Sequence, residues 1–123
     1  MKKLNSWFEI GSMEYMTYIL FGYEIEADEV LVTWFLNGQV HREDGPAVIW
    51  ADGGQEWWLN GQRHREDGPA VIWADGGQEW WLNDQIHRED GPAYIGADGT
   101  QSWWLNSQEY TERDFNEKTK LLV

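Results

Sequence analysis

Short runs of apolar residues separated by turn residues cover most of the chain. Residues 47–50 (AVIW) and 55–59 (QEWWL) flank the turn dipeptide Asp52-Gly53. Both runs are rich in β-branched and aromatic residues, and both are too short to form stable helices. This pattern predicts a β-hairpin.

Two further turn signals follow the hairpin. Asn60-Gly61 is the stronger, because both residues tolerate the positive φ of a tight hairpin turn. Asp67-Gly68-Pro69 supplies the other turn. Proline has no N–H to donate, so we expect each proline at the start of a strand. The pattern thus predicts units of two strands and a shaped connection.

This pattern repeats with a period of 23 residues. The heptad HREDGPA begins at residues 41, 64 and 87, and an aromatic block, WFLNG or a variant of WWLNG, begins at residues 34, 57, 80 and 103. A third element, Ala-Asp-Gly, begins at residues 51, 74 and 97. A lone hairpin of this size buries too little apolar surface to offset the entropy of ordering it. Successive hairpins are therefore expected to pair edge to edge and share their aromatic faces.

The two ends differ from the middle, as the caps of a repeat array do. Thr111-Glu112-Arg113-Asp114 resembles a capping box and leads into apolar residues, which predicts a short C-terminal helix. Residues 13–32 alternate aromatic and aliphatic residues with glutamates, which predicts one or two strands. We expect one repeat domain, residues 1–123, with an N-terminal cap or degenerate repeat (1–33), repeats (34–106) and a C-terminal helical cap (107–123).

These elements predict an all-β fold. Antiparallel β-hairpin repeats are expected to stack into an extended twisted sheet that ends in a short capping helix. A sheet array exposes its edges, so the N-terminal edge is a candidate for a dimer contact.

The charge changes the picture of what the surface can bind. The chain carries a net charge of −13, from 22 acidic and 9 basic residues, and most of the acidity falls in the repeats. This sign disfavours nucleic acid and anionic lipid and favours a basic protein partner. The alternative is that the charge only keeps a chain with 10 tryptophans soluble. With no cysteine and no apolar run of membrane-spanning length, we expect a cytoplasmic protein that does not cross a membrane.

The unit W-W-L-N-G-Q-x-H-R-E-D-G-P-A-x-I-x-A-D-G resembles the MORN family of repeats, and more narrowly the MORN-variant repeats of bacterial and phage proteins. The resemblance covers residues 34–106 and rests on the aromatic before Asn-Gly, the following His and Gly, and the Asp-Gly turn. Arg-Glu-Asp stands between that His and Gly here, whereas the usual pattern has the glycine directly after the His. The resemblance implies a β-hairpin repeat fold. Some similar proteins are grouped as antitoxins, which implies an inhibitory or immunity role.

No residue pattern predicts catalysis, a metal or a cofactor. His64, Glu66 and Asp67 form the best local set of metal ligands, but copies of it are expected about 10 Å apart, too far to share one ion. The Glu66-Asp67 carboxylate pair also recurs three times, whereas a catalytic pair is normally unique. The alternative is structural, with each His paired to the carboxylates of its connection.

The tryptophans carry the remaining information. Adjacent Trp57 and Trp58 must face opposite sides of a strand, so one tryptophan ladder is exposed or both are buried by twist or by a cap. Which of the two shares a face with Trp50 depends on whether the loop after Trp50 holds two or three residues, and the sequence leaves this open. The candidate binding residues are Trp34, Trp57, Trp58, Trp80, Trp81, Trp103, Trp104, Arg65, Glu66, Asp67, Arg88, Glu89 and Asp90.

These observations favour a non-catalytic binding protein, an inhibitor or an immunity or counter-defence factor that acts on a more basic protein. A phage-encoded nucleic-acid mimic is one specific version of this hypothesis. Two alternatives remain: a binder that holds a nucleotide or sugar between tryptophan faces, and a structural spacer whose repeats set only length.

Overall fold

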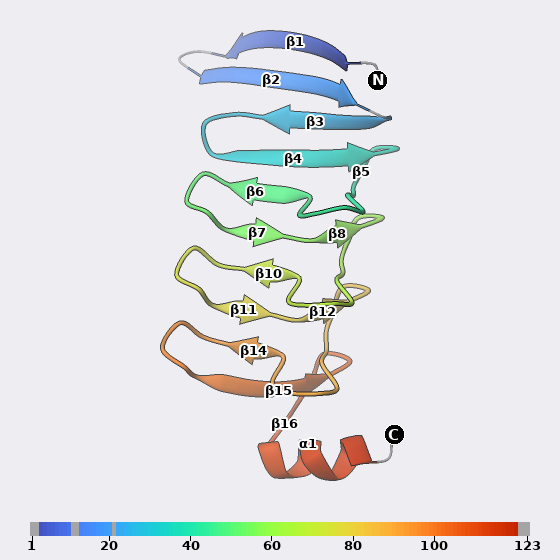
Figure 1. The fold of residues 1–123 in the computed structure, drawn as a ribbon, viewed down its shortest axis with the longest axis vertical. Coiled ribbons are helices and arrows are strands. Elements are labelled where there is room, and N and C mark those ends of the chain that lie inside the picture. The colour runs from blue at the N-terminus through green and yellow to red at the C-terminus, as the bar shows by residue number, and fades with distance from the viewer. Residues whose placement is uncertain (1–2, 11–12, 21, 121–123) are drawn as a thin grey trace. The chain divides into compact units, whose positions relative to one another are not determined.

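The computed structural model describes residues 3–10, 13–20 and 22–120 (Figure 1). The chain divides into two compact units, residues 1–62 and 63–123. Each unit is an antiparallel β structure of short strands. The expectation of one repeat domain with caps at 1–33 and 107–123 stays a prediction.

In the first unit, consecutive strands pair antiparallel in the order β1-β2-β3-β4-β6-β7. Within this sheet, β4 pairs with β6, so one hairpin joins the next edge to edge, as the sequence predicts. Two short elements lie off this path: β5 pairs with β4, and β8 pairs with β9. The strands are β1 (Lys3–Ile10), β2 (Met13–Leu20), β3 (Tyr23–Ala27), β4 (Leu31–Leu36), β5 (Gln39–Val40), β6 (Val48–Trp50), β7 (Gln55–Glu56), β8 (Trp58–Leu59) and β9 (Gln62–Arg63), which runs across the division.

The N-terminal region holds more strands than the sequence predicts. Residues 13–32 contain β2, β3 and the start of β4, and β1 precedes them. Asp28 makes the turn between β3 and β4, because its Oδ1 accepts from the backbone N–H groups of Val30 at 2.7 Å and Leu31 at 2.9 Å. An aspartate that bonds to the backbone two and three residues ahead closes such a turn without glycine. The two complete strands within residues 13–32 match the prediction of one or two strands there, whereas β1 was not predicted.

The second unit repeats the same construction and ends in a helix. The order of its main sheet is β10-β11-β14-β15-β16, and β11 pairs with β14, again hairpin to hairpin. A separate hairpin is formed by β12 and β13. The elements are β10 (Val71–Ile72), β11 (Gln78–Glu79), β12 (Trp81–Leu82), β13 (Gln85–Ile86), β14 (Tyr94–Ile95), β15 (Gln101–Leu105), β16 (Gln108–Tyr110) and α1 (Glu112–Thr119). The predicted class, antiparallel hairpin repeats with a short C-terminal helix, is confirmed.

The Asn-Gly turns have the geometry that their sequence predicts. Asn60 and Gly61 have φ angles of 52° and 76°, and two consecutive positive φ angles define a type I′ turn. The later copies keep this geometry without glycine, since φ is 65° at both Asp84 and Ser107. There the side chain compensates in part: Asp84 Oδ1 accepts from Arg63 N, and Ser107 Oγ accepts from Ile86 N, each at 3.3 Å.

The Asp-Gly loops hold three residues, which the sequence left open. Trp50 N donates to the carbonyl of Gly54 at 2.9 Å, and Gly53 N donates back to the carbonyl of Trp50 at 3.0 Å. Gly53 has a φ of 99°, so the loop is a turn closed by one left-handed residue. Asp52 fixes it further by accepting from Gly54 N at 2.9 Å.

The alanine of each heptad lies in the centre of the packing. Ala47, Ala70 and Ala93 are all 0% exposed. Ala93 N donates to Ser102 O at 2.9 Å, while its carbonyl accepts from Trp80 N at 2.8 Å, so its backbone joins two aromatic blocks. Each alanine methyl group is therefore fully enclosed by protein.

The helix α1 is the predicted C-terminal cap. Thr111 is its N-cap, and its Oγ1 accepts from Asp114 N at 3.1 Å. Phe115 is 3% exposed, and the helix packs on β15 and β16. Residues 108–110 form β16 ahead of the helix, and residues 121–123 of the expected cap 107–123 lie outside the described residues. Within the described ranges, no helix has the length and apolar character to cross a membrane.

Candidate functional site

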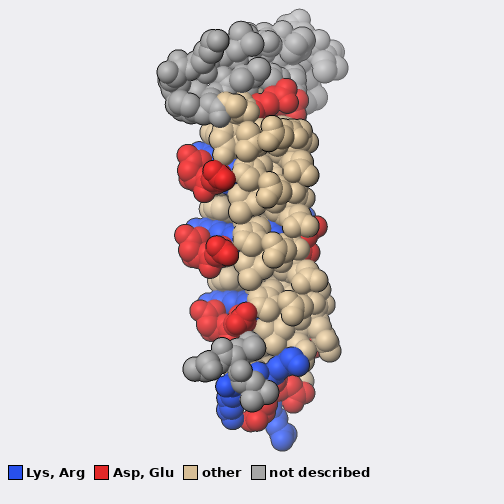
Figure 2. Space-filling model, turned by 90° about the vertical axis from the view of Figure 1, so that its right-hand side faces the viewer, with Lys and Arg blue, Asp and Glu red and all other residues tan. Residues whose placement is uncertain are grey.

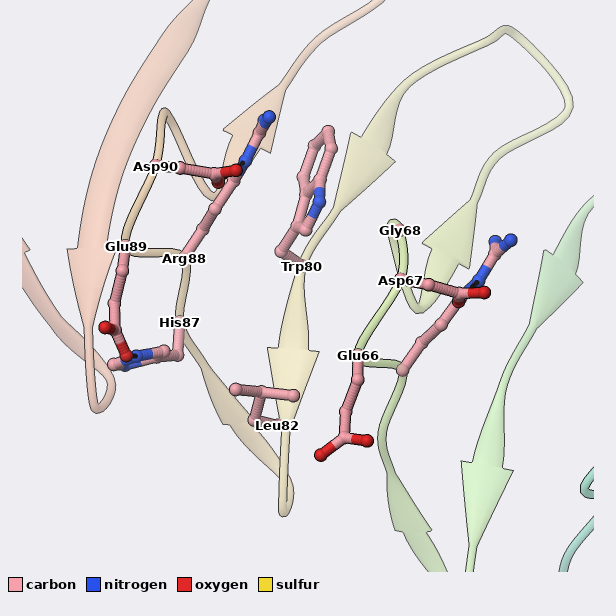
Figure 3. Close-up of a pocket in the computed structure, with 10 residues that line it drawn as sticks. Glu66, Asp67, Gly68, Trp80, Leu82, His87, Arg88, Glu89 and Asp90 are labelled. Carbon is pink, nitrogen blue, oxygen red and sulfur yellow. Dashed lines mark hydrogen bonds and ion pairs between the residues drawn. The ribbon is translucent and has the colours of Figure 1, made fainter.

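An arginine organises each heptad loop. Arg88 donates from Nε to Asp90 Oδ1 at 2.8 Å and from Nη1 to the carbonyl of Pro92 at 3.1 Å. Its guanidinium carbon lies 4.0 Å from the ring centroid of Trp80, a cation–π stack (Figure 3). One side chain thus holds the loop closed and fixes it against the aromatic block of its own repeat.

The first heptad uses the same contacts. Arg42 donates to Asp44 at 2.9 Å and to the Pro46 carbonyl at 3.2 Å, and its guanidinium lies 3.8 Å from the centroid of Trp34. The hydrogen bond from Arg42 is the main reason that the pKa of Asp44 is lowered. In the middle heptad, Arg65 donates to Asp67 at 3.0 Å and to the Pro69 carbonyl at 3.1 Å.

The heptad glycine leaves room for this arginine. A Cβ placed on Gly91 would lie 3.0 Å from Arg88 Cζ, and one on Gly68 would lie 3.1 Å from Arg65 Cζ. Both distances are shorter than ordinary carbon–carbon contact. A side chain at the heptad glycine would therefore crowd the guanidinium.

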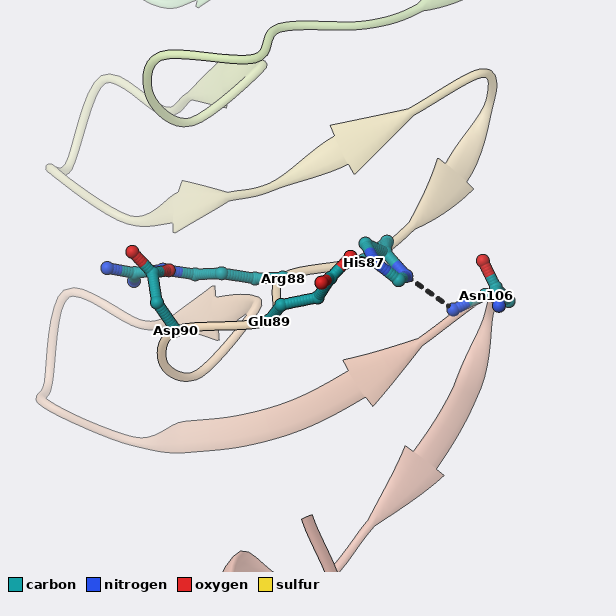
Figure 4. Close-up of polar contacts among 5 residues, drawn as sticks. All are labelled: His87, Arg88, Glu89, Asp90 and Asn106. Atoms are coloured by element: carbon teal, nitrogen blue, oxygen red, sulfur yellow. Dashed lines mark hydrogen bonds and ion pairs between the residues drawn. The ribbon is translucent and has the colours of Figure 1, made fainter. Parts of the chain in front are cut away.

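The heptad histidine joins one repeat to the turn of the next. His87 Nδ1 accepts from Asn106 N at 2.9 Å (Figure 4), and His64 Nδ1 accepts from Asn83 N at 3.0 Å. Because Nδ1 accepts in this bond, Nε2 is the ring nitrogen that can donate. Nε2 of His87 faces Glu89 at 2.9 Å. The contact between His and a loop carboxylate is thus present, and the bond to the next turn adds to it.

The tryptophan ladders separate onto two faces. Glu56 accepts from the indole N–H groups of Trp50 at 2.8 Å and Trp58 at 3.0 Å, which places Trp58 rather than Trp57 with Trp50. In the next copy Glu79 accepts from Trp73 at 2.7 Å and from Trp81 at 2.9 Å. This ladder of indoles joined by a carboxylate was not predicted from the sequence.

The third copy replaces this arrangement as a set. Gly96 stands where the earlier copies have Trp50 and Trp73, and Ser102 stands where they have a glutamate. Ser102 Oγ accepts from the remaining indole, that of Trp104, at 2.8 Å. The Tyr94 hydroxyl lies 3.1 Å from the position of a Cβ on Gly96, so tyrosine occupies part of the missing indole's space.

A groove lies between the two heptad loops of the second unit. It encloses about 670 Å³. Figure 3 shows Trp80 between the loop that carries Arg88 and the loop of Glu66, Asp67 and Gly68, with Leu82 farther along the same strand. The lining residues are Arg65, Glu66, Asp67, Gly68, Trp80, Leu82, His87, Arg88, Glu89 and Asp90.

The carboxylates at this groove face outward. The side chains of Glu66, Asp67 and Asp90 are 84%, 87% and 87% exposed. In Figure 2, the acidic and basic groups of the heptads gather in compact clusters beside a broad face of other residues. The groove therefore combines an aromatic and aliphatic wall with an acidic rim.

The structure brings together about half of the residues that the sequence singled out. Trp80, Arg65, Glu66, Asp67, Arg88, Glu89 and Asp90 line one groove. Trp103 lines a smaller cavity with Phe115 of α1. Trp58 and Trp81 belong instead to the indole–carboxylate ladder. Trp104 occupies the corresponding position in the third copy and donates to Ser102. Trp34 stacks on Arg42 in the first unit, and Trp57 follows β7 there.

Sequence reasoning missed Leu82, Gly68 and His87 as groove residues. Leu82 belongs to the repeated Trp-Trp-Leu-Asn block, two residues after Trp80, so strand alternation places both on the same side. That spacing was the available signal. Among the residues the structure describes, no three His, Asp or Glu side chains converge as metal ligands.

No protein-family model matches the chain, and comparisons with curated proteins and with solved structures found no match. The resemblance to MORN-variant repeats stays a prediction that rests on the motif.

Proposed function

We propose that this chain is a non-catalytic binding protein that recognises a basic protein, as an inhibitor or as an immunity or counter-defence factor. The observation that carries the proposal is the groove of the second unit, which Trp80 and Leu82 line together with four carboxylates, three of them more than 80% exposed. A cytoplasmic setting and the relation to MORN-variant repeats belong to the same proposal.

The charge supports a basic partner. A net charge of −13 on a chain of this size creates a field that attracts cationic surfaces over several ångströms and speeds encounter. Exposed carboxylates alone give little affinity, because water and salt screen them. The partly exposed indole and leucine side chains supply the apolar contact that a stable complex needs.

The internal contacts support a role without catalysis. Arg88 and Asp90 are already committed to the loop that they close, and the same contacts recur in the first heptad. A group that must take up or release a proton in a reaction is poorly served by such a fixed structural bond. The heptads are thus better suited to present a surface than to perform chemistry.

The proposal is tested by affinity capture from a host-cell lysate at low salt, with the purified protein as bait and mass spectrometry as the readout. The matched control bait carries Glu43→Gln, Glu66→Gln and Glu89→Gln, which removes one exposed charge from each heptad and no hydrogen bond to an arginine. We expect one basic protein that binds the natural bait, releases at about 0.5 M salt and is depleted on the control bait. Equal recovery on both baits, or recovery of no basic protein, would contradict the proposal.

A further inference from the structure

We propose that the groove between the two heptad loops of the second unit is a receptor for an arginine side chain on the surface of the basic partner. This inference rests on the proposed function and names the group that the groove takes.

The first argument is the position of Trp80. Arg88 covers one side of its ring, and the loop with Glu66, Asp67 and Gly68 lies across the groove on the other side (Figure 3). The volume of about 670 Å³ falls in the range of clefts that hold small ligands. A flat group can therefore enter beside the indole from the solvent side.

The second argument is that the chain already uses this recognition on itself. Arg88 stacks on Trp80 while it donates to Asp90, and Arg42 stacks on Trp34 while it donates to Asp44. Indole face and carboxylate together therefore form a guanidinium site in this fold. On the side of the groove opposite Arg88, the lining is the preceding heptad loop, where Asp67 is bound by Arg65 and the Glu66 carboxylate points toward Leu82 (Figure 3).

The third argument is the charge balance of the groove. Its four carboxylates and two arginines leave two negative charges. Glu66 is the carboxylate best placed to bind a new cation, because its contact with His64 is 3.8 Å, longer than a hydrogen bond. The other carboxylates are shared with the arginines or with His87.

Arginine fits this site better than lysine. A guanidinium is planar, stacks on an indole and donates in two parallel bonds to a carboxylate, whereas an ammonium is compact and strongly hydrated. A groove with an indole in its wall and carboxylates at its rim matches the flat, charged group. Lysine would gain the charge attraction and lose the stacking.

The test uses the full-length protein labelled with ¹⁵N and two acetylated, amidated peptides, (Gly-Arg)₄ and (Gly-Lys)₄, titrated at low salt. The readout is the indole N–H signal of Trp80, assigned by its loss in Trp80→Phe. We expect the arginine peptide to shift this signal and to bind roughly threefold more tightly than the lysine peptide. Glu66→Gln with Glu89→Gln should weaken arginine binding by roughly fivefold, as expected for the loss of two exposed charges.

The matched control is Glu24→Gln with Glu29→Gln, which removes the same charge from exposed residues of the first unit. It should leave the affinity within about twofold, because its charges lie outside the groove and do not pair with a peptide bound there. Equal weakening by both double variants, no shift at Trp80, or equal affinity for both peptides would overturn the inference. If the basic protein is still captured, such a result contradicts only the arginine site, and the proposed function stands. If no basic protein is captured while the arginine peptide still binds, the result contradicts only the proposed function.

Discussion

His87 Nδ1 accepts a 2.9 Å hydrogen bond from the backbone N–H of Asn106, nineteen residues later in the chain. His41 and Asn60 are joined in the same way at 2.9 Å. In both cases a heptad side chain satisfies the N–H at the first positive-φ residue of the next turn. The repeat is therefore held by a specific polar bond between successive copies in addition to its sheet pairing.

Replacing these histidines by phenylalanine should destabilise the protein to different extents. Phenylalanine keeps the ring and removes the acceptor, so the turn N–H loses its partner. The bond of His41, which is 5% exposed, is partly buried, so its loss should cost about 2 kcal/mol; the bond of His87 to Asn106 is exposed to solvent, so His87→Phe should cost about 1 kcal/mol. Urea denaturation measures both. A change below a few tenths of a kcal/mol in both variants would show that the bond does not hold the repeats.

Arg88→Lys should destabilise the protein even though lysine keeps the positive charge. Lysine cannot donate to Asp90 and to the Pro92 carbonyl in the geometry of the guanidinium, and it stacks poorly on Trp80. We expect a loss of about 1–2 kcal/mol in the free energy of unfolding. Arg113→Lys on the exposed side of α1 is the control and should change nothing measurable. Equal stability of the two variants would contradict the role of the guanidinium.

Gly91→Ala should act through Arg88. The new Cβ would lie 3.0 Å from Arg88 Cζ and would push the guanidinium out of its loop contacts. In a double-mutant cycle, Gly91→Ala should cost about 1–2 kcal/mol in the natural background and much less when Arg88 is already alanine. Additive losses would mean that the glycine is needed for another reason.

The indole–carboxylate ladder makes a prediction about combined changes. Glu79→Gln leaves only one acceptor oxygen for the indoles of Trp73 and Trp81, so it should cost about 1.5–3 kcal/mol. Trp73→Gly with Glu79→Ser copies the pairing of Gly96 and Ser102, and its loss should be smaller than the sum of the single losses. Thermal and urea unfolding of Trp73→Gly, Glu79→Ser and the double variant give the comparison. If the two single losses of stability add up to the loss in the double variant, the residues at these two positions are not coupled.

Stability in acid should depend on Asp28. Hydrogen bonds from the N–H groups of Leu31 and Val30 lower the pKa of this carboxyl. A group whose folded pKa is depressed stabilises the fold above its unfolded pKa of about 4, and that contribution is lost as the pH falls through the lower folded value. Asp28→Asn, which does not titrate, should therefore lose less stability than the natural protein between about pH 4 and pH 2. If the urea unfolding midpoints of the two proteins fall equally as the pH is lowered over that range, Asp28 does not contribute to the pH dependence of stability.

The sequence predicts the repeat, the hairpins and the helix because each has a local cause. Asn60-Gly61 adopts the positive φ angles that its residue types favour, and Thr111 caps α1. The pairing of hairpin to hairpin follows from the energetics of small units. These features need no knowledge of long-range contacts.

The finer geometry depends on contacts that the sequence does not display. A single left-handed residue, Gly53, decides that Trp58 rather than Trp57 lies with Trp50. The role of Arg88 depends on how the chain curves around its side chain. Asp28 closes the turn between β3 and β4 with its side chain, a contact that the residue types alone do not display.

The most direct test of the central claim is the association rate of the captured basic protein, measured by stopped-flow fluorescence as the salt concentration rises. Recognition through the acidic rim and Trp80 predicts that the rate constant falls by about tenfold or more between 0.02 M and 0.5 M salt. It also predicts that Glu66→Gln with Glu89→Gln raises the dissociation rate. A rate constant that does not change with salt, together with unchanged dissociation in the double variant, would contradict the claim that this acidic groove binds the partner.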